Sequence, residues 1–218
     1  AKEAIRRYKR RRVSEINIRN VISNFGGDNT FVFPSPSVPW GYLFQRPQQM
    51  AYALSKLNNN VIYSVEGEYR IEPDKNVIGL KEIADNLYLY NDYQNGRLLE
   101  SLDKAILWRY WSNQINYFES KNNRHIYIYD WVDDIEVYNY SDKEIQYHNK
   151  LIEDSDILIT TAENIYIKAC KIRDDVLLLP NACDYNFFAN PIDIDWKELD
   201  YIRECYDVII GYYGAIAE

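Results

Sequence analysis

The sequence is poor in residues that build disulfide frameworks or zinc sites. Among its 218 residues are three cysteines and two histidines. Cys170, Cys183 and Cys205 are widely spaced, and none belongs to a Cys-x-x-Cys pair. A disulfide framework and a structural zinc site are therefore both unexpected. This cysteine usage favours a reducing, cytoplasmic setting.

Long apolar runs and several familiar motifs are also missing. No apolar stretch approaches the length of a membrane span, and the basic start is not followed by the apolar stretch of a signal peptide. No G-x-G-x-x-G, G-x-x-x-x-G-K-[ST] or G-x-S-x-G pattern occurs. The dinucleotide fingerprint, the P-loop and the nucleophile elbow are thereby excluded.

Charge is distributed unevenly along the chain. The net charge is −8, yet the start, AKEAIRRYKRRR, sums to +6, so the other 206 residues sum to −14. Such an acidic body argues against a nucleic-acid partner, because phosphate neutralisation needs a basic surface. The basic start allows two interpretations: peripheral contact with anionic lipid or another polyanion, or a solvated helix joined to something upstream.

The pattern of apolar residues predicts an α/β fold. Residues 2–24 look helical and end at Gly26 and Gly27. Short apolar segments then alternate with helical ones, which is typical of a mostly parallel, Rossmann-like sheet with helices on both faces. We predict strands near 30–33, 61–65, 87–90, 105–109, 126–130, 157–160 and 176–179. We predict helices near 44–57, 97–104, 141–154 and 162–172, the third starting at a Ser-x-x-Glu capping box.

Three turns that follow predicted strands carry most of the polar chemistry. They cover residues 34–46, 130–134 and 180–184. In parallel sheets ligands bind outside the carboxyl ends of the strands, so these turns are the candidate site. Asp130, Asp133 and Asp134 can orient a hydroxyl group, accept its proton or hold a cation, although helix capping or a solvated acidic turn explains them equally well.

Three further polar residues are expected to be structural. Thr161 is predicted to cap the helix that follows it, where free N–H groups could also hold an anion. His125 precedes its strand and so lies at the wrong end for the site. His148, amid polar residues of a helix, is predicted to be on the surface.

Taken in order, four segments resemble the N-terminal domain of a bacterial glycosyltransferase with GT-B architecture, similar to enzymes of teichuronic-acid and capsular polysaccharide synthesis. The segments are WGYLFQRPQQMAYALSKLNNNVIYSVEGE, YDWVDD, EDSDILITTAENIY and LLLPNACDYNFF. The last departs from the family's Pro-Asn-Gly-Val-Asp pattern, since Ala182 and Cys183 replace Gly and Val. The resemblance covers about residues 30–218.

The resemblance implies transfer of a sugar from a nucleotide-diphosphate sugar to a hydroxyl group of a surface polysaccharide or other glycan. It implies no cofactor, and no metal is expected if backbone groups and Arg46 stabilise the diphosphate. Further domains of the full-length protein are expected as partners. The implied site residues are catalytic Asp130, Asp133 and Asp134, substrate-binding Trp40, Gly41, Gln45, Arg46 and Asn181, and Gly214 at the donor phosphates. Two alternatives are that Arg46 holds its loop by an ion pair and that Trp40 only packs within the loop.

The predicted organisation has three parts. Residues 1–25 form a basic helical extension, residues 26–205 the acceptor-side domain, and residues 206–218 either a last strand of the same sheet or the first strand of a donor domain. On the second interpretation the chain is a fragment that binds nucleotide sugars weakly by itself and is inactive alone. The alternatives are a non-catalytic, transferase-like scaffold and another sugar-nucleotide enzyme. The donor, acceptor and linkage are not encoded in these motifs.

Overall fold

The fold was analysed in a computed structural model that describes residues 2–41, 44–65, 77–91, 97–118, 123–137, 139–190, 200, 202 and 204–210. The chain divides into two compact units, Ala1–Asn181 and Ala182–Glu218. The first contains the sheet, and the second contains helix α6 (Tyr185–Ala189). Predicted residue Gly214 lies outside the described residues.

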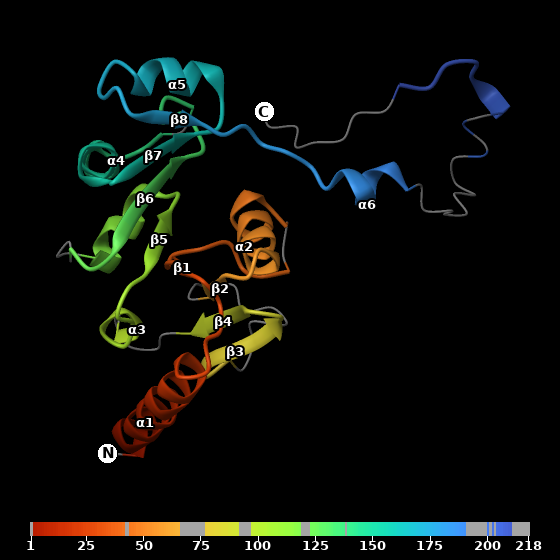
Figure 1. The fold of residues 1–218 in the computed structure, drawn as a ribbon. Helices are drawn as coiled ribbons and strands as arrows, with labels where there is room; N and C mark the ends of the chain where they lie inside the picture. Colours follow the sequence, from red (N-terminus) through yellow and green to blue (C-terminus); the bar gives the residue numbers. More distant parts are fainter. Residues whose placement is uncertain are drawn as a thin grey trace. The chain divides into compact units, whose positions relative to one another are not determined.

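Eight strands form one sheet in the order β3-β4-β2-β1-β5-β6-β7-β8 (Figure 1). Every strand pair is parallel except β3–β4, which is antiparallel. This topology confirms the predicted Rossmann-like α/β fold. The strands are β1 (Thr30–Phe33), β2 (Asn60–Ser64), β3 (Gly79–Ala84), β4 (Leu87–Asn91), β5 (Ile106–Arg109), β6 (Ile126–Trp131), β7 (Ile157–Thr160) and β8 (Val176–Leu178).

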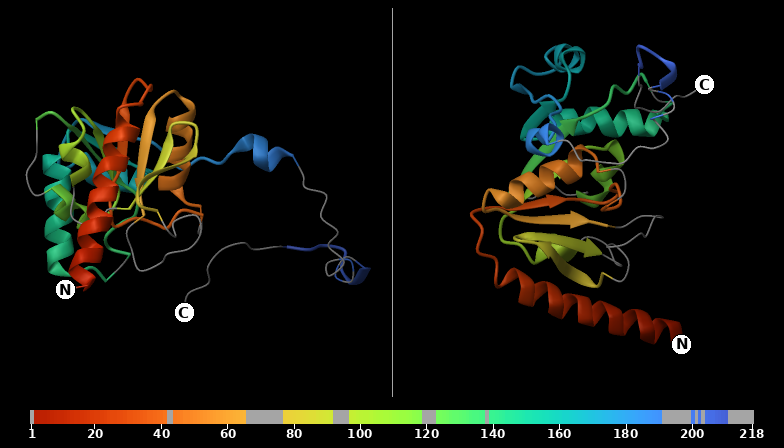
Figure 2. Two further views of the ribbon diagram at one scale, coloured as in Figure 1. Left: turned by 90° about the horizontal axis from the view of Figure 1, so that it is seen from below. Right: turned by 90° about the vertical axis from the view of Figure 1, so that its right-hand side faces the viewer.

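Helices cover both faces of this sheet (Figure 2). Helix α2 lies on one face, and α3 and α4 lie on the other. The remaining helical elements are α1, which contacts β3, α5 beside β7 and β8, and the 3₁₀ helix η1 next to α4. Their bounds are α1 (Lys2–Ile22), α2 (Arg46–Lys56), α3 (Arg97–Glu100), η1 (Ser112–Phe118), α4 (Asp142–Asp154) and α5 (Glu163–Ala169).

Alternation along the strands divides the core between the two faces. Phe31 and Phe33 belong to the cluster that packs against α2, whereas Val32 between them belongs to the cluster that includes Leu98 of α3. Because successive side chains of a strand point to opposite faces, the middle of a strand covered on both faces is apolar. All five residues of β2 are buried, and apolar Val61, Ile62 and Tyr63 lie between polar Asn60 and Ser64.

Local sequence signals set two of the helix starts. Helix α4 begins at the predicted capping box, where the Ser141 hydroxyl accepts from Glu144 N and Ser141 N donates to the Glu144 carboxylate. Helix α2 begins at Arg46 rather than near Phe44. Pro47 in its first turn lacks an N–H that would be unpaired there in any case.

Several predicted elements need correction. Strand β3 was not predicted, because its mixed sequence GLKEIA and its antiparallel pairing lie outside the alternating strand–helix pattern. Helix α3 ends at Glu100, and α5 spans only Glu163–Ala169. Val208, Ile209 and Ile210, where the last strand was expected to run, are not in a strand.

Helix α1 docks on β3 through a side chain that substitutes for a strand partner. Leu80 N donates to Asn17 Oδ1 at 2.6 Å, and Ile18 on the next position of the helix is buried. Gly79 permits this close approach. Its φ is +69°, and a Cβ there would overlap the Asn17 side chain and lie 3.1 Å from the Ser14 carbonyl oxygen.

Replacing Gly79 with alanine should therefore destabilise the protein by about 2 kcal/mol, the sum of a left-handed backbone penalty and displacement of Asn17. Urea unfolding at equilibrium measures the change. Gly26→Ala is the matched control, because a Cβ at Gly26 meets no atom within 4 Å. Equal losses in the two variants would contradict this account of the α1–β3 contact.

Candidate functional site

The turn after β1 is held by one side chain from η1 and one from β2. Gln114 Nε2 donates to the carbonyl oxygens of Pro34 and Pro36, at 2.8 Å in each case. The Tyr63 hydroxyl donates to Val38 O at 2.7 Å. Gln114 itself is fully buried. Residues 34–38 of the turn are thus held by η1 and β2.

Trp40 and Gly41 occupy different environments in this turn. The Trp40 ring is buried, with edge-to-face contacts to Phe44 and Tyr63 at centroid distances of 5.2 and 5.1 Å. The ring therefore packs in the core rather than presenting a free face. Gly41 is exposed and has a φ of +84°, a conformation that glycine adopts without strain.

Gln45 and Gln48 join the turn to α2. Gln45 is the N-cap residue, and its N–H donates to Gln48 Oε1 at 2.8 Å. Gln48 is fully buried and also donates to Pro39 O at 3.2 Å. Gln45 and Gln48 thereby fix the start of the helix, and Arg46 is its first residue.

Arg46 and Asp130 form a bidentate ion pair across the carboxyl ends of the strands. Arg46 Nε lies 2.8 Å from Asp130 Oδ2, and Nη2 lies 3.1 Å from Oδ1. Trp108 Nε1 donates to Oδ2 at 3.0 Å. Burial raises the pKa of the Asp130 carboxyl group, and the hydrogen bonds from Arg46 and Trp108 oppose that rise.

The same guanidinium group also contacts the turn after β8. Arg46 Nη1 lies 3.2 Å from Asn181 Oδ1 and 3.5 Å from Pro180 O. Three predicted site residues, Arg46, Asp130 and Asn181, are therefore in one cluster although they come from distant segments. All three guanidinium nitrogens form hydrogen bonds. The Arg46 side chain therefore links α2, β6 and the turn after β8.

Asp133 and Asp134 lie outside this cluster. Asp134 pairs with Lys168 of α5 at 2.8 Å, and Lys168 also lies 2.7 Å from Glu136. Hydrogen bonding to Lys168 lowers the pKa of Asp134. Asp133 has no ion pair among the described residues, and desolvation raises the pKa of its carboxyl group. A carboxylate with a raised pKa is a better proton acceptor.

Three buried polar side chains that the sequence did not single out lie at the same edge of the sheet. Ser35 follows β1, Ser64 ends β2 and Asn91 ends β4. Each is at least nine-tenths buried, and Ser35 Oγ, Ser64 Oγ and Asn91 Oδ1 have no hydrogen-bond partner among the residues that the structure describes. Buried polar atoms are normally paired, so these three are available to a ligand. Their position after apolar strands was the one available sequence signal.

Strand order places the Arg46–Asp130 cluster near the point of the sheet at which the direction of strand addition reverses. From β1 the chain continues on one side to β2 and β4, and on the other side to β5 and β6. Ligands of open α/β sheets bind outside the carboxyl ends at such a point. Ser35 follows β1, and Trp108 and Asp130 belong to β5 and β6. The candidate site therefore lies where the topology predicts one.

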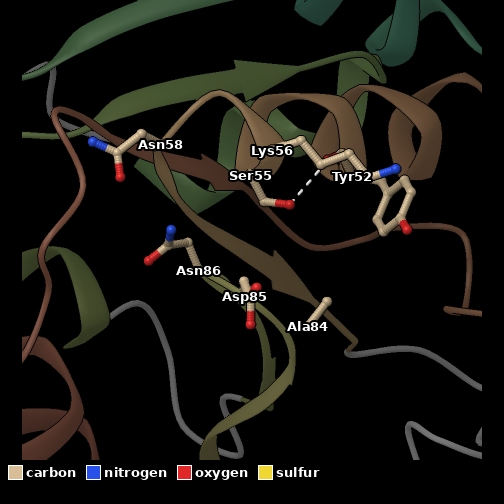
Figure 3. Close-up of a pocket in the computed structure, with 7 residues that line it drawn as sticks. All are labelled: Tyr52, Ser55, Lys56, Asn58, Ala84, Asp85 and Asn86. Carbon is tan, nitrogen blue, oxygen red and sulfur yellow. Dashed lines mark hydrogen bonds between the residues drawn. The ribbon is translucent and has the colours of Figure 1, made fainter.

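A cavity of about 380 Å³ lies at the opposite, amino-terminal edge of the sheet (Figure 3). Its residues come from the end of α2 and the β3–β4 turn. The Lys56 ammonium group stands 4.1 Å from the centre of the Tyr52 ring. The lining residues are Tyr52, Ser55, Lys56, Asn58, Ala84, Asp85 and Asn86. None belongs to the predicted site, so this cavity is separate from the Arg46–Asp130 cluster.

Two polar residues differ from their predicted roles. Thr161 does not cap α5, whose N-cap residue is Ala162; its hydroxyl donates to Val132 O at 2.7 Å instead. His148 is not on the surface but is 2% exposed. Its Nδ1 lies 2.7 Å from the Tyr129 hydroxyl, and its ring meets Trp131 edge-on at 4.4 Å.

Comparisons with protein-family models and with curated proteins found no match for this chain. In the part of the chain that the structure describes, no helix has both the length and the apolar character needed to cross a bilayer. The same residues contain no group of three or more His, Cys, Asp or Glu side chains placed to hold a metal ion.

Removing the cation from the buried pair should destabilise the fold strongly. Arg46→Met leaves the Asp130 carboxylate buried without its main partner, at an expected cost of about 3 kcal/mol in the free energy of unfolding. Arg46→Met/Asp130→Leu should cost less than the single change, because it leaves no unpaired charge. Lys168→Met is the control and should cost less than about 1 kcal/mol, because Lys168 is one-third exposed. A double variant less stable than Arg46→Met would contradict the role of charge.

His148 should make stability depend on pH. Burial lowers its pKa to about 4 from an ordinary value of 6.5, while the Asp134 charge opposes the shift. The unfolded chain then binds a proton more readily, so stability is full above pH 6.5 and falls by about 3 kcal/mol as the pH drops to 4. Urea unfolding across this range should show a smaller fall for His148→Gln. Parallel profiles for the two proteins would show that His148 does not carry this dependence.

Proposed function

We propose that this chain is the acceptor-side domain of a glycosyltransferase, which moves a sugar from a nucleotide-diphosphate sugar to a hydroxyl group of a surface polysaccharide or other glycan acceptor. One observation carries the proposal. Arg46, Asp130 and Asn181 come from three of the four segments that resemble the family, and their side chains are in contact. A binding site at the carboxyl edge of a parallel sheet requires side chains of separate turns to converge in this way.

The neighbouring groups support a role in binding a hydroxyl-rich acceptor. Ser35, Ser64 and Asn91 offer unpaired hydroxyl and amide oxygens at the carboxyl edge. Sugar hydroxyl groups donate and accept hydrogen bonds, so they suit such atoms. The Arg46–Asp130 pair would position the turns on either side. In this scheme Arg46 and Asp130 are positioning residues.

The chemical step assigned to this domain is removal of a proton. As the acceptor oxygen forms its bond to the anomeric carbon, the bond from that carbon to the diphosphate breaks, and the acceptor's proton passes to a carboxylate. Asp133 suits this role better than Asp130, because Asp130 already accepts three hydrogen bonds. Asp134, in turn, is held by Lys168.

The full-length protein tests this assignment. Release of nucleoside diphosphate and formation of glycoside should be followed by mass spectrometry with a panel of nucleotide-diphosphate sugars and glycan acceptors. Asp133→Asn should lower kcat by about 100-fold or more while leaving the donor KM nearly unchanged. Asp134→Asn is the matched control and should change kcat far less.

The alternative is a non-catalytic, transferase-like domain. It is favoured by the mutual pairing of Arg46 and Asp130, which leaves neither group free for a substrate. Absence of transfer with every donor in the panel, from folded protein that still binds a glycan, would select this alternative. Transfer that is unaffected by Asp133→Asn would retain the enzyme and reject Asp133 as its base.

A further inference from the structure

Helix α1 has two apolar faces, and the sheet covers one of them. The covered face contains Asn17, which bonds to β3, and Ile18, Val21 and Ile22, which pack with the core under that side of the sheet. Ile5, Tyr8, Val13 and Ile16 are instead 54–63% exposed. Isolated exposed apolar residues are ordinary, but four on one helix call for an explanation.

The exposed residues are arranged on the side of α1 that faces away from the sheet. At 3.6 residues per turn, Ile5, Tyr8 and Ile16 fall within about 80° of one another, and Val13 lies about 60° beyond Ile16. Ile18 and Val21 lie on the opposite side. Exposed Lys9 and Arg12 fall within the same sector as Ile5 and Ile16. Figure 2 shows α1 along the β3 side of the sheet, with its start extending past the strands. We name Ile5, Tyr8, Lys9, Arg12, Val13 and Ile16 the outer face of α1.

We propose that the outer face of α1 binds the surface of an anionic lipid bilayer. The charge distribution selects this partner, because residues 1–12 sum to +6 and the rest of the chain to −14. An anionic surface attracts the helix and repels the body, so the helix would be the point of contact. On the outer face Arg12 and Lys9 flank Ile5 and Ile16, so the basic side chains can reach lipid headgroups while the isoleucines enter the interface.

A bilayer fits this face better than a nucleic acid does. Phosphate contacts would use Lys9 and Arg12 but would leave Ile5 and Ile16 in water. In a bilayer interface the apolar side chains enter the acyl boundary, while the long basic side chains reach the headgroups. The proposal is independent of the proposed sugar transfer, because it requires no substrate.

Vesicle flotation with the full chain tests the proposal. The chain should bind vesicles of phosphatidylcholine mixed with phosphatidylglycerol, and should bind pure phosphatidylcholine vesicles at least about tenfold more weakly. Ile5→Ser/Ile16→Ser should reduce binding to the mixed vesicles by about tenfold or more, because two apolar side chains are lost from the interface. Lys9→Gln/Arg12→Gln should lower binding and flatten its dependence on salt.

The matched control is Ile167→Ser/Ile172→Ser, which removes two isoleucines of the same exposure near α5. It should bind like the wild type. All variants change exposed residues, and circular dichroism should show unchanged helix content. Absence of binding to mixed vesicles would overturn the proposal. Binding that is unchanged in Ile5→Ser/Ile16→Ser would also overturn it. A dimer in solution that dissociates in this variant would overturn it too, because the outer face would then join two copies of the chain.

Discussion

The buried ion pair between Arg46 and Asp130 joins segments that form the carboxyl edge of the sheet. Arg46 is the first residue of α2, and Asp130 lies near the end of β6 and is 1% exposed. A carboxylate is costly to remove from water, and only close, multiple hydrogen bonds offset that cost. Asp130 receives three. The positions of the three surrounding turns are therefore coupled through one side-chain contact.

Residues 34–41 of the proline-rich turn after β1 are held by side chains from two neighbouring elements. Gln114 of η1 and Tyr63 of β2 donate to its backbone carbonyls, and Trp40 packs in the core. Arg46 then begins the helix in a fixed place. Segments of the chain that are 84 and 135 residues apart thereby meet at one guanidinium group. A site assembled in this way is rigid before any ligand arrives.

The sequence predicted the elements better than it predicted their contacts. The seven strands expected between residues 30 and 179 are present, because each is a short apolar run, and the Ser141 capping box marks the start of α4. The strand expected after residue 206 is not found among the described residues. Strand β3 escaped notice because Lys81 and Glu82, both exposed, interrupt its apolar sequence. The burial of His148 had a signal, since it precedes Leu151 and Ile152 by three and four residues and so shares their helix face.

Contacts between distant segments had no such signal. Threonine is a common helix cap, and Thr161 lies just before α5. Its hydroxyl nevertheless donates to Val132 O, directly after β6. Arg46 was expected either to meet a ligand's charge or to hold its loop by an ion pair, yet no local pattern indicates that Asp130 is the partner. Periodicity reports which face of an element is apolar. It does not report which polar groups meet after the sheet has formed.

The unpaired atoms at the carboxyl edge carry a physical argument of their own. Leaving a buried hydroxyl or amide oxygen without a partner costs about 1–3 kcal/mol. Ser35, Ser64 and Asn91 each bear such an atom, at the ends of β1, β2 and β4. Apolar residues of similar size would remove that cost without altering the strands. Polar groups kept at a cost to stability are common at functional sites, and a hydroxyl-rich ligand would restore the missing bonds. The cost therefore supports a binding role for this edge of the sheet, where Arg46 and Asp130 neutralise each other's charge.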